Sequence, residues 1–261
     1  ETPSECAVRC AQAIEDLILF HGPSTVCAVI AEPIASTPII PGDEYWPMLR
    51  QICDKYGVVL IADEVINGFG RTGKMFAMEH FGVTPDILTM AKGITSSYLP
   101  LANTIVTPQI SDAFAGSDNI FRQALTFGGH PVTAAAALAN IEILESEGMV
   151  ENSEKTGAYF LEQLKSLQED HEMIGDVRGI GLLVGMEFVK DRETKASFPA
   201  EAQLGDKLTE AFREERLILL GGNGRTVGMG PPLCMTPADV DEVVGRLDRA
   251  IGNVEKTLPI S

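Results

Sequence analysis

Short aliphatic runs alternate with amphipathic stretches along the first half of the chain. The amphipathic stretches repeat their apolar residues at helical spacing, and the aliphatic runs have the length and β-branched content of buried strands. Helices are predicted over 4–20, 44–57 and, more briefly, near 74–81, and strands over 26–32, 58–62, 86–91 and 102–107. Because the two kinds of element alternate, we expect an α/β fold with helices packed on a mainly parallel sheet.

The second half begins with a long helix and then changes pattern. This helix is predicted from about Pro131 to Gly148, with proline near its start and glycine near its end, as helix termini prefer. Further helices are predicted over 151–169, 201–215 and 238–255, with a strand rich in glycine and valine over 180–189. We therefore expect a domain boundary near Gly148, with part of a large α/β domain in residues 1–148 and a smaller α+β domain in residues 149–261.

The composition fits a globular protein and narrows its partners. A chain of 261 residues with 45% hydrophobic content can bury a sizeable core. Its net charge of −17 argues against nucleic acid, because phosphate binding requires clustered Lys and Arg. No apolar run reaches the length of a membrane span, and the first predicted helix carries acidic residues where a signal peptide has a basic start. We expect neither nucleic acid nor a membrane as partner.

The five cysteines indicate neither a disulfide framework nor a zinc site. Their number is odd, and no two of them form a Cys-x-x-Cys pair. Cys6 and Cys10 share a predicted helix face at a spacing of four residues, where packing is the simpler explanation. We expect no metal ion and take a reducing cytoplasm as the default location.

Two charged residues follow predicted strands. Asp63 comes directly after the aliphatic run VVLIA at 58–62, and Lys92 comes after DILTMA at 86–91. Ligands of open α/β sheets bind outside the carboxyl ends of the strands, so the two side chains are expected to converge on one pocket. There an aspartate can hold a proton on a ring nitrogen, and a partly desolvated lysine can attack a carbonyl to form an imine. A buried Asp–Lys ion pair with a helix cap explains the same residues equally well at this point.

An ordered series of motifs surrounds this pair. In chain order these are AEP at 31–33, DEV at 63–65, GFGRTG at 68–73, PDI at 85–87, KG at 92–93, TFGGHPV at 126–132, VRGIGLLVGMEFV at 177–189 and GPPLCMT at 230–236. The series resembles the class III aminotransferases, the ω-aminotransferase group of the fold type I enzymes that depend on pyridoxal 5'-phosphate (PLP). The similarity extends from about Val26 to about Val244. It implies that 1–148 is the latter part of the large PLP-binding domain and that 149–261 is the small C-terminal domain.

The resemblance also implies a role for several residues. Lys92 is expected to bind the cofactor as a Schiff base and to relay a proton, and Asp63 to keep the pyridine nitrogen protonated. Val65, two residues past Asp63 on an extended backbone, is expected to pack on the face of the cofactor ring. The resemblance places Thr126 on the cofactor phosphate of the partner subunit, which makes a homodimer a requirement for catalysis. Glu32 is a candidate for facing the substrate.

Each of these last roles has a structural alternative. Val65 can equally pack in a core, Thr126 can cap the helix that follows it, and Glu32 can fix the turn before the next proline. His130 and Arg71 are expected to be structural rather than catalytic. For Arg71 we expect hydrogen bonds that tie down the GFGRTG loop.

The chain departs from the family pattern at several positions. Ala35 and Ser36 stand where glutamine or methionine and then glycine are common, and Ser97 stands where glycine is frequent after the lysine. Arg225 is out of register with the arginine that holds a substrate carboxylate in many relatives, which puts carboxylate binding by Arg225 in question. The family's glycine- and serine-containing phosphate loop has no counterpart before residue 26. The chain is therefore expected to be a fragment, a processed product or the ordered part of a longer protein.

The expected function is ping-pong amino transfer between an amine or amino acid and a keto acid. Three alternatives stay open. The first is another PLP reaction on the same scaffold, such as that of a racemase or an aminomutase. The second is a lyase that uses Lys92 as a Schiff base without a cofactor, and the third is a non-catalytic fragment that lacks the phosphate loop.

Overall fold

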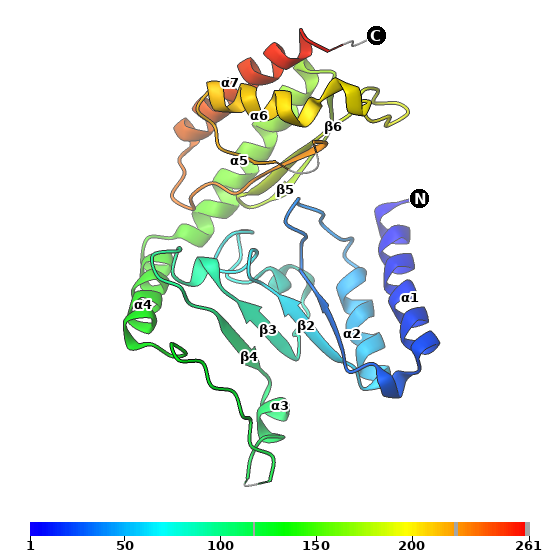
Figure 1. Ribbon diagram of the computed structural model, residues 1–261, viewed down its shortest axis with the longest axis vertical. Helices are drawn as coiled ribbons and strands as arrows, with labels where there is room; N and C mark the ends of the chain where they lie inside the picture. Colours follow the sequence, from blue (N-terminus) through cyan, green and yellow to red (C-terminus); the bar gives the residue numbers. More distant parts are fainter. Residues whose placement is uncertain (117, 222–223, 259–261) are drawn as a thin grey trace. The chain divides into compact units, whose positions relative to one another are not determined.

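A computed structural model describes residues 1–116, 118–221 and 224–258 of the chain (Figure 1). The contacts divide the chain into two compact units. Unit 1 comprises Glu1–Ile34, Ile40–Gly70 and Lys74–Gly148, and unit 2 comprises Ala35–Ile39, Arg71–Gly73 and Met149–Ser261. Two short segments from the first half of the chain therefore belong to the second unit.

Unit 1 is built on a four-stranded sheet of order β1-β2-β3-β4. The strands β1 (Ala28–Ala31), β2 (Val59–Asp63) and β3 (Ile87–Met90) are parallel, whereas β4 (Asn103–Val106) pairs with β3 in the antiparallel direction. The predicted mainly parallel sheet is thus confirmed, with one antiparallel strand at its edge.

The helices α1 (Pro3–His21) and α2 (Tyr45–Tyr56) pack on each other, and α2 also contacts β2. A capping box begins α1, because the Thr2 hydroxyl accepts from the Glu5 backbone N–H and the Glu5 carboxylate accepts from the Thr2 N–H. Buried apolar residues join these helices to the sheet. They are Ala11, Ile18, Trp46, Leu49, Ile52, Cys53, Val58, Leu60, Ala62 and Met78.

Shorter elements complete unit 1. They are the 3-10 helices η1 (Pro23–Thr25), η2 (Ala77–Phe81) and η3 (Lys92–Ile94), the helix α3 (Pro108–Asp112) and the longer helix α4 (Pro131–Ser146). The short helix predicted near 74–81 is a 3-10 helix that begins at Ala77. Between α3 and α4, residues 118–130 have no regular secondary structure and are exposed (Figure 1).

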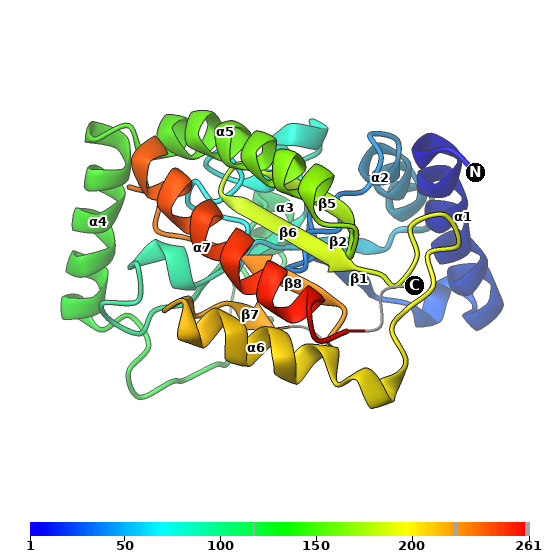
Figure 2. The ribbon, with the colours of Figure 1, turned by 90° about the horizontal axis from the view of Figure 1, so that it is seen from above.

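Unit 2 contains an antiparallel sheet of order β5-β6-β8-β7 with helices on one face (Figure 2). Its strands are β5 (Ile174–Ile180), β6 (Leu183–Phe188), β7 (Leu220–Gly221) and β8 (Thr226–Met229). Its helices are α5 (Met149–Asp170), the 3-10 helix η4 (Ala200–Ala202), α6 (Leu204–Glu214) and α7 (Pro237–Glu255). Helix α7 packs against both α5 and α6. None of the helices in the described ranges is long and apolar enough to cross a membrane.

Glycines allow the segment 71–73 to enter unit 2. A Cβ on Gly181, which has a φ of +53°, would lie 2.4 Å from the carbonyl carbon of Thr72. A Cβ on Gly157 of α5 would lie 2.1 Å from the Gly181 carbonyl oxygen. The backbone N–H of Leu182 donates to the carbonyl oxygen of Arg71 at 3.0 Å. Larger residues at these glycines would push the helix, the β5–β6 turn and this segment apart.

A buried histidine joins α5 to α7 in unit 2. His171 follows the end of α5, and its Nδ1 lies 2.7 Å from a carboxylate oxygen of Glu255 while its Nε2 lies 2.9 Å from one of Asp248. Burial lowers the pKa of His171, but the hydrogen bonds to Glu255 and Asp248 outweigh burial, so the pKa is raised above its ordinary value of 6.5. Only the protonated ring can donate to both carboxylates.

We expect His171 to make the stability of the protein depend on pH. A raised folded-state pKa contributes stability that is fully present below about pH 6.5 and is lost as the pH rises through the folded-state value. The melting temperature of His171→Gln should therefore fall well below that of the unmodified protein near pH 5.5 and approach it near pH 8.5. Thermal unfolding of both proteins across this range measures the difference. A gap in melting temperature that stays constant or widens as the pH rises would contradict this role.

Candidate active site

Three of the predicted site residues lie at one edge of the unit 1 sheet. In the parallel ladder Ala31 pairs with Ala62, so that Glu32, the residue after β1, comes at the same level as Asp63, the last residue of β2. Asp63 in turn pairs with Thr89 of β3, and the β3 chain continues for three residues beyond Thr89 to Lys92. Because β1, β2 and β3 are parallel, their carboxyl ends carry Glu32, Asp63 and Lys92 to the same edge.

Asp63 is held through one of its two carboxylate oxygens. Its Oδ1 accepts from the backbone N–H of Val65 at 3.1 Å and from the Thr89 hydroxyl at 3.1 Å. Within the described ranges, Oδ2 of Asp63 accepts no hydrogen bond. The carboxylate is therefore oriented by its own turn and by the neighbouring strand, and one oxygen remains available to a ligand.

The sequence predicts an extended backbone at Val65, but Val65 lies in a turn. Strand β2 ends at Asp63, and residues 65–70 form a turn in which the Gly68 N–H donates to the Glu64 carbonyl oxygen at 2.9 Å. The rule that residues two apart share one side therefore does not apply. What links Val65 to Asp63 is the backbone hydrogen bond to Oδ1.

Lys92 begins the 3-10 helix η3 directly after Ala91, and its backbone is in the left-handed region with a φ of +43°. This conformation is uncommon for residues with a side chain and is found more often at functional sites. Lys92 is exposed rather than partly desolvated. Among the described residues neither Asp63 nor Lys92 forms an ion pair, so the alternative of a buried Asp–Lys pair is wrong.

The turn that carries Lys92 packs on the GFG turn. A Cβ on Gly93 would lie 2.9 Å from the Cβ of Phe69 and 3.3 Å from the Gly68 carbonyl oxygen. Phe69 itself has a φ of +60°, and its N–H donates to the carbonyl oxygen of Met75 at 2.7 Å. The glycine after the lysine is thus required by the close approach of two turns.

Ser97 has a φ of +61°, and this explains why glycine suits the position. We expect Ser97→Gly to raise the free energy of unfolding by about 0.5 to 1 kcal/mol, since it relieves a left-handed residue that carries a Cβ. Chemical denaturation measures the change. Ser24→Gly is the matched control, because Ser24 is an exposed serine outside the left-handed region, and it should destabilise slightly. Equal destabilisation by both substitutions would contradict the strain at Ser97.

Thr126 lies in an exposed turn formed by residues 126–129, before α4. The N-cap of α4 is His130, whose Nδ1 accepts from the Val132 N–H at 3.2 Å. The alternative that Thr126 caps this helix is therefore wrong, and His130 makes a structural contact as the cap.

The two arginines discussed from sequence both have structural partners in unit 2. Arg71 donates through Nη1 to the carbonyl oxygens of Leu182 at 2.9 Å and Pro231 at 2.6 Å, which confirms the hydrogen bonds predicted for it. Burial lowers the pKa of Arg71 to about 10. Arg225 pairs with Glu187, with 2.7 Å between Nε and Oε1. The Nε atom of Arg225 therefore already lies beside an internal carboxylate.

The sequence analysis did not predict the contacts of two polar residues near the site, Glu64 and Asn140. The buried Glu64 carboxylate accepts from the N–H groups of Ala77 at 3.0 Å and Met78 at 2.8 Å, which begins η2. Burial raises the pKa of Glu64, although these two hydrogen bonds act against it. Asn140 of α4 contacts the turn after Lys92. Neither residue stands in a sequence pattern that indicates such a contact.

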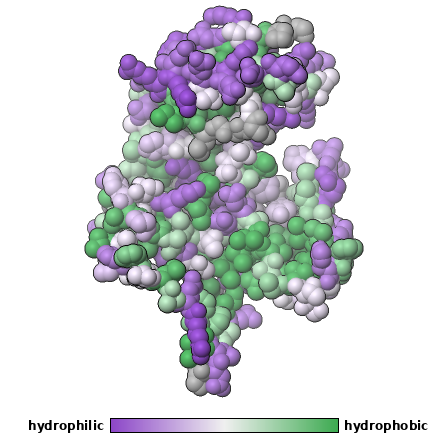
Figure 3. Space-filling model, in the orientation of Figure 1, coloured by the Kyte–Doolittle hydropathy of each residue, from purple (hydrophilic) through white to green (hydrophobic). Residues whose placement is uncertain are grey.

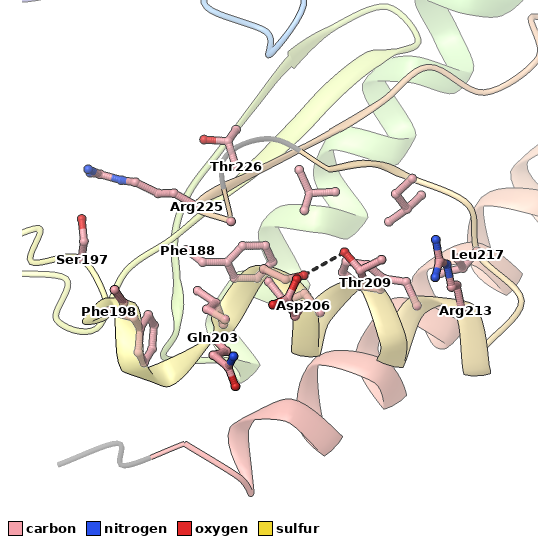
Figure 4. A pocket seen from close by; sticks show the side chains of 18 of the residues that line it. Phe188, Ser197, Phe198, Gln203, Asp206, Thr209, Arg213, Leu217, Arg225 and Thr226 are labelled. Atoms are coloured by element: carbon pink, nitrogen blue, oxygen red, sulfur yellow. Dashed lines mark hydrogen bonds between the residues drawn. The ribbon is translucent and has the colours of Figure 1, made fainter.

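A pocket of about 630 Å³ lies in unit 2 (Figure 4). Apolar side chains such as Phe188, Leu208 and Phe212 line it, and Arg213 and Arg225 lie at its opposite ends (Figure 4). None of the residues proposed for catalysis lines this pocket. The described residues also contain no cluster of His, Cys, Asp and Glu suited to a metal ion.

Comparison with known proteins identifies the family. Residues 2–251 match the family model described as aminotransferase class-III. The chain belongs to the class III aminotransferases. It is 40% identical to a diaminobutyrate–2-oxoglutarate transaminase of Halomonas elongata, over 98% of this chain and 56% of that protein. It is 42% identical to a taurine–pyruvate aminotransferase of Bilophila wadsworthia, over 97% of this chain and 58% of that protein.

This class III aminotransferase chain also resembles solved transaminases. One is an amine transaminase from an uncultivated Pseudomonas species in its PLP-bound form, with a TM-score of 0.91 and 36% identity over 97% of this chain and 58% of that one. The fold type I architecture expected from the motifs is confirmed, and PLP is the cofactor of the family. The chain spans only 56% to 58% of the length of these proteins.

Proposed function

We propose that the protein containing this chain is a PLP-dependent aminotransferase that moves an amino group between an amine or amino acid and a keto acid by a ping-pong mechanism. The observation that carries the proposal is the position of Asp63 and Lys92 at the carboxyl ends of adjacent parallel strands, in a chain of the class III family. Because the chain spans little more than half of its relatives, the activity is proposed for the longer protein.

The residues at this edge of the sheet fit the cofactor. Oδ2 of Asp63 accepts no hydrogen bond from a described residue, and Lys92 is exposed and forms no ion pair within the same part of the chain. We propose that Lys92 attaches PLP covalently as a Schiff base, that Asp63 binds its pyridine nitrogen and that Val65 packs on its ring. When bound, PLP draws electrons from the substrate carbon, so that a proton can leave that carbon.

The protein supplies the proton transfers. Oδ2 of Asp63 holds a proton on the pyridine nitrogen, while Oδ1 stays fixed by the Val65 N–H and the Thr89 hydroxyl. Lys92 Nζ, once released by the incoming amine, accepts the proton from the substrate carbon and later returns it. Glu32, at the end of the next strand, is proposed to face the substrate.

We further propose a homodimer in which Thr126 of one subunit binds the cofactor phosphate in the other. Exposed hydrophobic residues gather over unit 1 (Figure 3), as expected for a surface that another chain or segment covers. Near Thr126 and on α4 they are Ile120, Phe121, Leu125, Phe127, Val132 and Leu138.

Residues 1–148 are assigned to the large domain and 149–261 to the small one. The free state of all five cysteines supports a cytoplasmic location.

An amino-transfer assay of the full-length protein tests this function. Relatives are named for pyruvate and for 2-oxoglutarate, so both keto acids should be offered with a panel of primary amines and amino acids. We expect alanine or glutamate to form in an amount equal to the donor consumed. A protein that binds PLP and racemises or rearranges an amino acid, with no net transfer to either keto acid, would contradict the proposal.

A further inference from the structure

Asn140 of α4 joins its side-chain amide to the turn that carries Lys92. Its Nδ2 donates to the carbonyl oxygens of Gly93 at 2.9 Å and Ile94 at 3.2 Å. Its Oδ1 accepts from the hydroxyl of Ser96 at 2.6 Å. One amide therefore bridges three residues of the turn and uses both its donor and its acceptor.

The turn needs such support, because its backbone is strained. Lys92, Ser96 and Ser97 all have φ values between +43° and +61°, in the left-handed region that side chains rarely adopt. Two backbone hydrogen bonds of the turn are long: the Lys92 carbonyl oxygen accepts from the N–H of Thr95 at 3.2 Å and of Ser97 at 3.3 Å. Strained conformations persist only where the surrounding structure holds them.

Asn140 is suited to hold this turn without disturbing the lysine. It lies in the middle of a 16-residue helix that buries Ala137 and Leu144 on nearby turns, and this packing holds the helix in place. Asparagine is a poor residue for a helix interior, and here its amide bonds across to the turn. The side chain is neutral, so it orients Lys92 without adding a charge beside it.

We propose that Asn140 is a positioning residue for Lys92, an inference that rests on the proposed aminotransferase function. By fixing the carbonyl groups of Gly93 and Ile94, it holds the left-handed backbone of Lys92 and so the direction of Nζ toward the edge of the sheet where Asp63 lies. It does not touch the reacting atoms.

The test compares two asparagines with the same kind of contact. Asn152 of α5, in unit 2, donates through Nδ2 to the carbonyl oxygens of Leu233 at 2.6 Å and Met235 at 3.0 Å. Asn140→Leu and Asn152→Leu remove these bonds while keeping the charge and the number and branching of the side-chain heavy atoms, and Asn140→Ala serves if the leucine variant does not fold. Both substitutions should lower the melting temperature of the full-length protein.

Only the change at Asn140 should alter the chemistry of Lys92. In the holoprotein we expect Asn140→Leu to lower kcat by about 10- to 100-fold with little change in KM, since small displacements of a catalytic group have effects of this size. The pH titration of the visible absorbance of the bound cofactor should also shift. Asn152→Leu should leave both quantities unchanged. If the two variants match in kcat and in this titration, Asn140 has only a structural role and the inference is wrong.

Hydrogen exchange on the cofactor-free protein separates this inference from the proposed function. The amides of Thr95, Ser96 and Ser97 should exchange roughly tenfold faster in Asn140→Leu than in the unmodified protein, and at the same rate in Asn152→Leu. Unchanged exchange in Asn140→Leu would overturn the inference. Failure of the proposed function would show instead as absent amino transfer by the unmodified protein, whatever the exchange result.

Discussion

Replacement of Lys92 by alanine will lower kcat for amino transfer by a factor on the order of 10⁴ or more, as for other residues that act both covalently and as a base. Without Nζ of Lys92, the end of β3 carries no amine that can attach the cofactor and move the proton of the substrate carbon. The left-handed backbone at this position tolerates alanine no worse than lysine, so the fold should be retained. Steady-state kinetics of the full-length protein with saturating cofactor measures the loss.

Lys165 provides the control for this prediction. It is an exposed lysine on α5, without an ion pair to a described residue and without a proposed role. Lys165→Ala should keep kcat within about twofold, as expected for an exposed residue without an ion pair or a proposed role. Activity of Lys92→Ala close to that of Lys165→Ala would remove Lys92 from the mechanism.

Asp63→Asn is expected to lower kcat by about 10² to 10⁴-fold while the cofactor stays bound. A loss of this size is typical when a group that takes part in acid–base catalysis is removed. Asparagine has the same shape, and its oxygen can still accept from the Val65 N–H and the Thr89 hydroxyl. It cannot balance the charge of a protonated pyridine nitrogen, so the ring would draw fewer electrons from the substrate carbon. Single-turnover kinetics should show that proton abstraction has become the slow step.

Asp54→Asn is the matched control for Asp63→Asn. Asp54 is an exposed carboxylate near the end of α2, paired with Arg50 at 2.7 Å on the same helix. Its replacement should cost little stability and leave turnover unchanged, since exposed ion pairs contribute little. Undiminished turnover in Asp63→Asn would show that the carboxylate does not act on the cofactor ring.

The strands and longer helices of unit 1 could be predicted because their sequences carry strong hydrophobic signals, whereas the short elements η1, η3 and α3 were missed. Strand β2, for example, was predicted over 58–62 from its aliphatic run and is observed over Val59–Asp63. In unit 2, β5 was missed, because its sequence IGDVRGI mixes glycine and charge with only three aliphatic residues. The assignment of 35–39 and 71–73 to unit 2 depends on contacts between residues far apart in sequence, which no local pattern contains.

The candidate site, too, could be predicted only in part. The common edge of Asp63 and Lys92 follows from two strand ends in a parallel sheet, and it could be predicted. The extended backbone predicted at Val65 was wrong, because the chain turns directly after β2, and the packing of Val65 on the cofactor ring stays a prediction. Asn140 could not be found, because its contact with Gly93 spans 47 residues and nothing near it marks it as polar support for a turn.

The covalent attachment of the cofactor to Lys92 is the central claim, and one measurement tests it most directly. The full-length holoprotein is reduced with borohydride, digested, and its peptides are mapped by mass spectrometry. We predict a phosphopyridoxyl label on Lys92, in the peptide that continues into Gly93 and Ile94. A label on any other lysine, with Lys92 unmodified, would contradict the account.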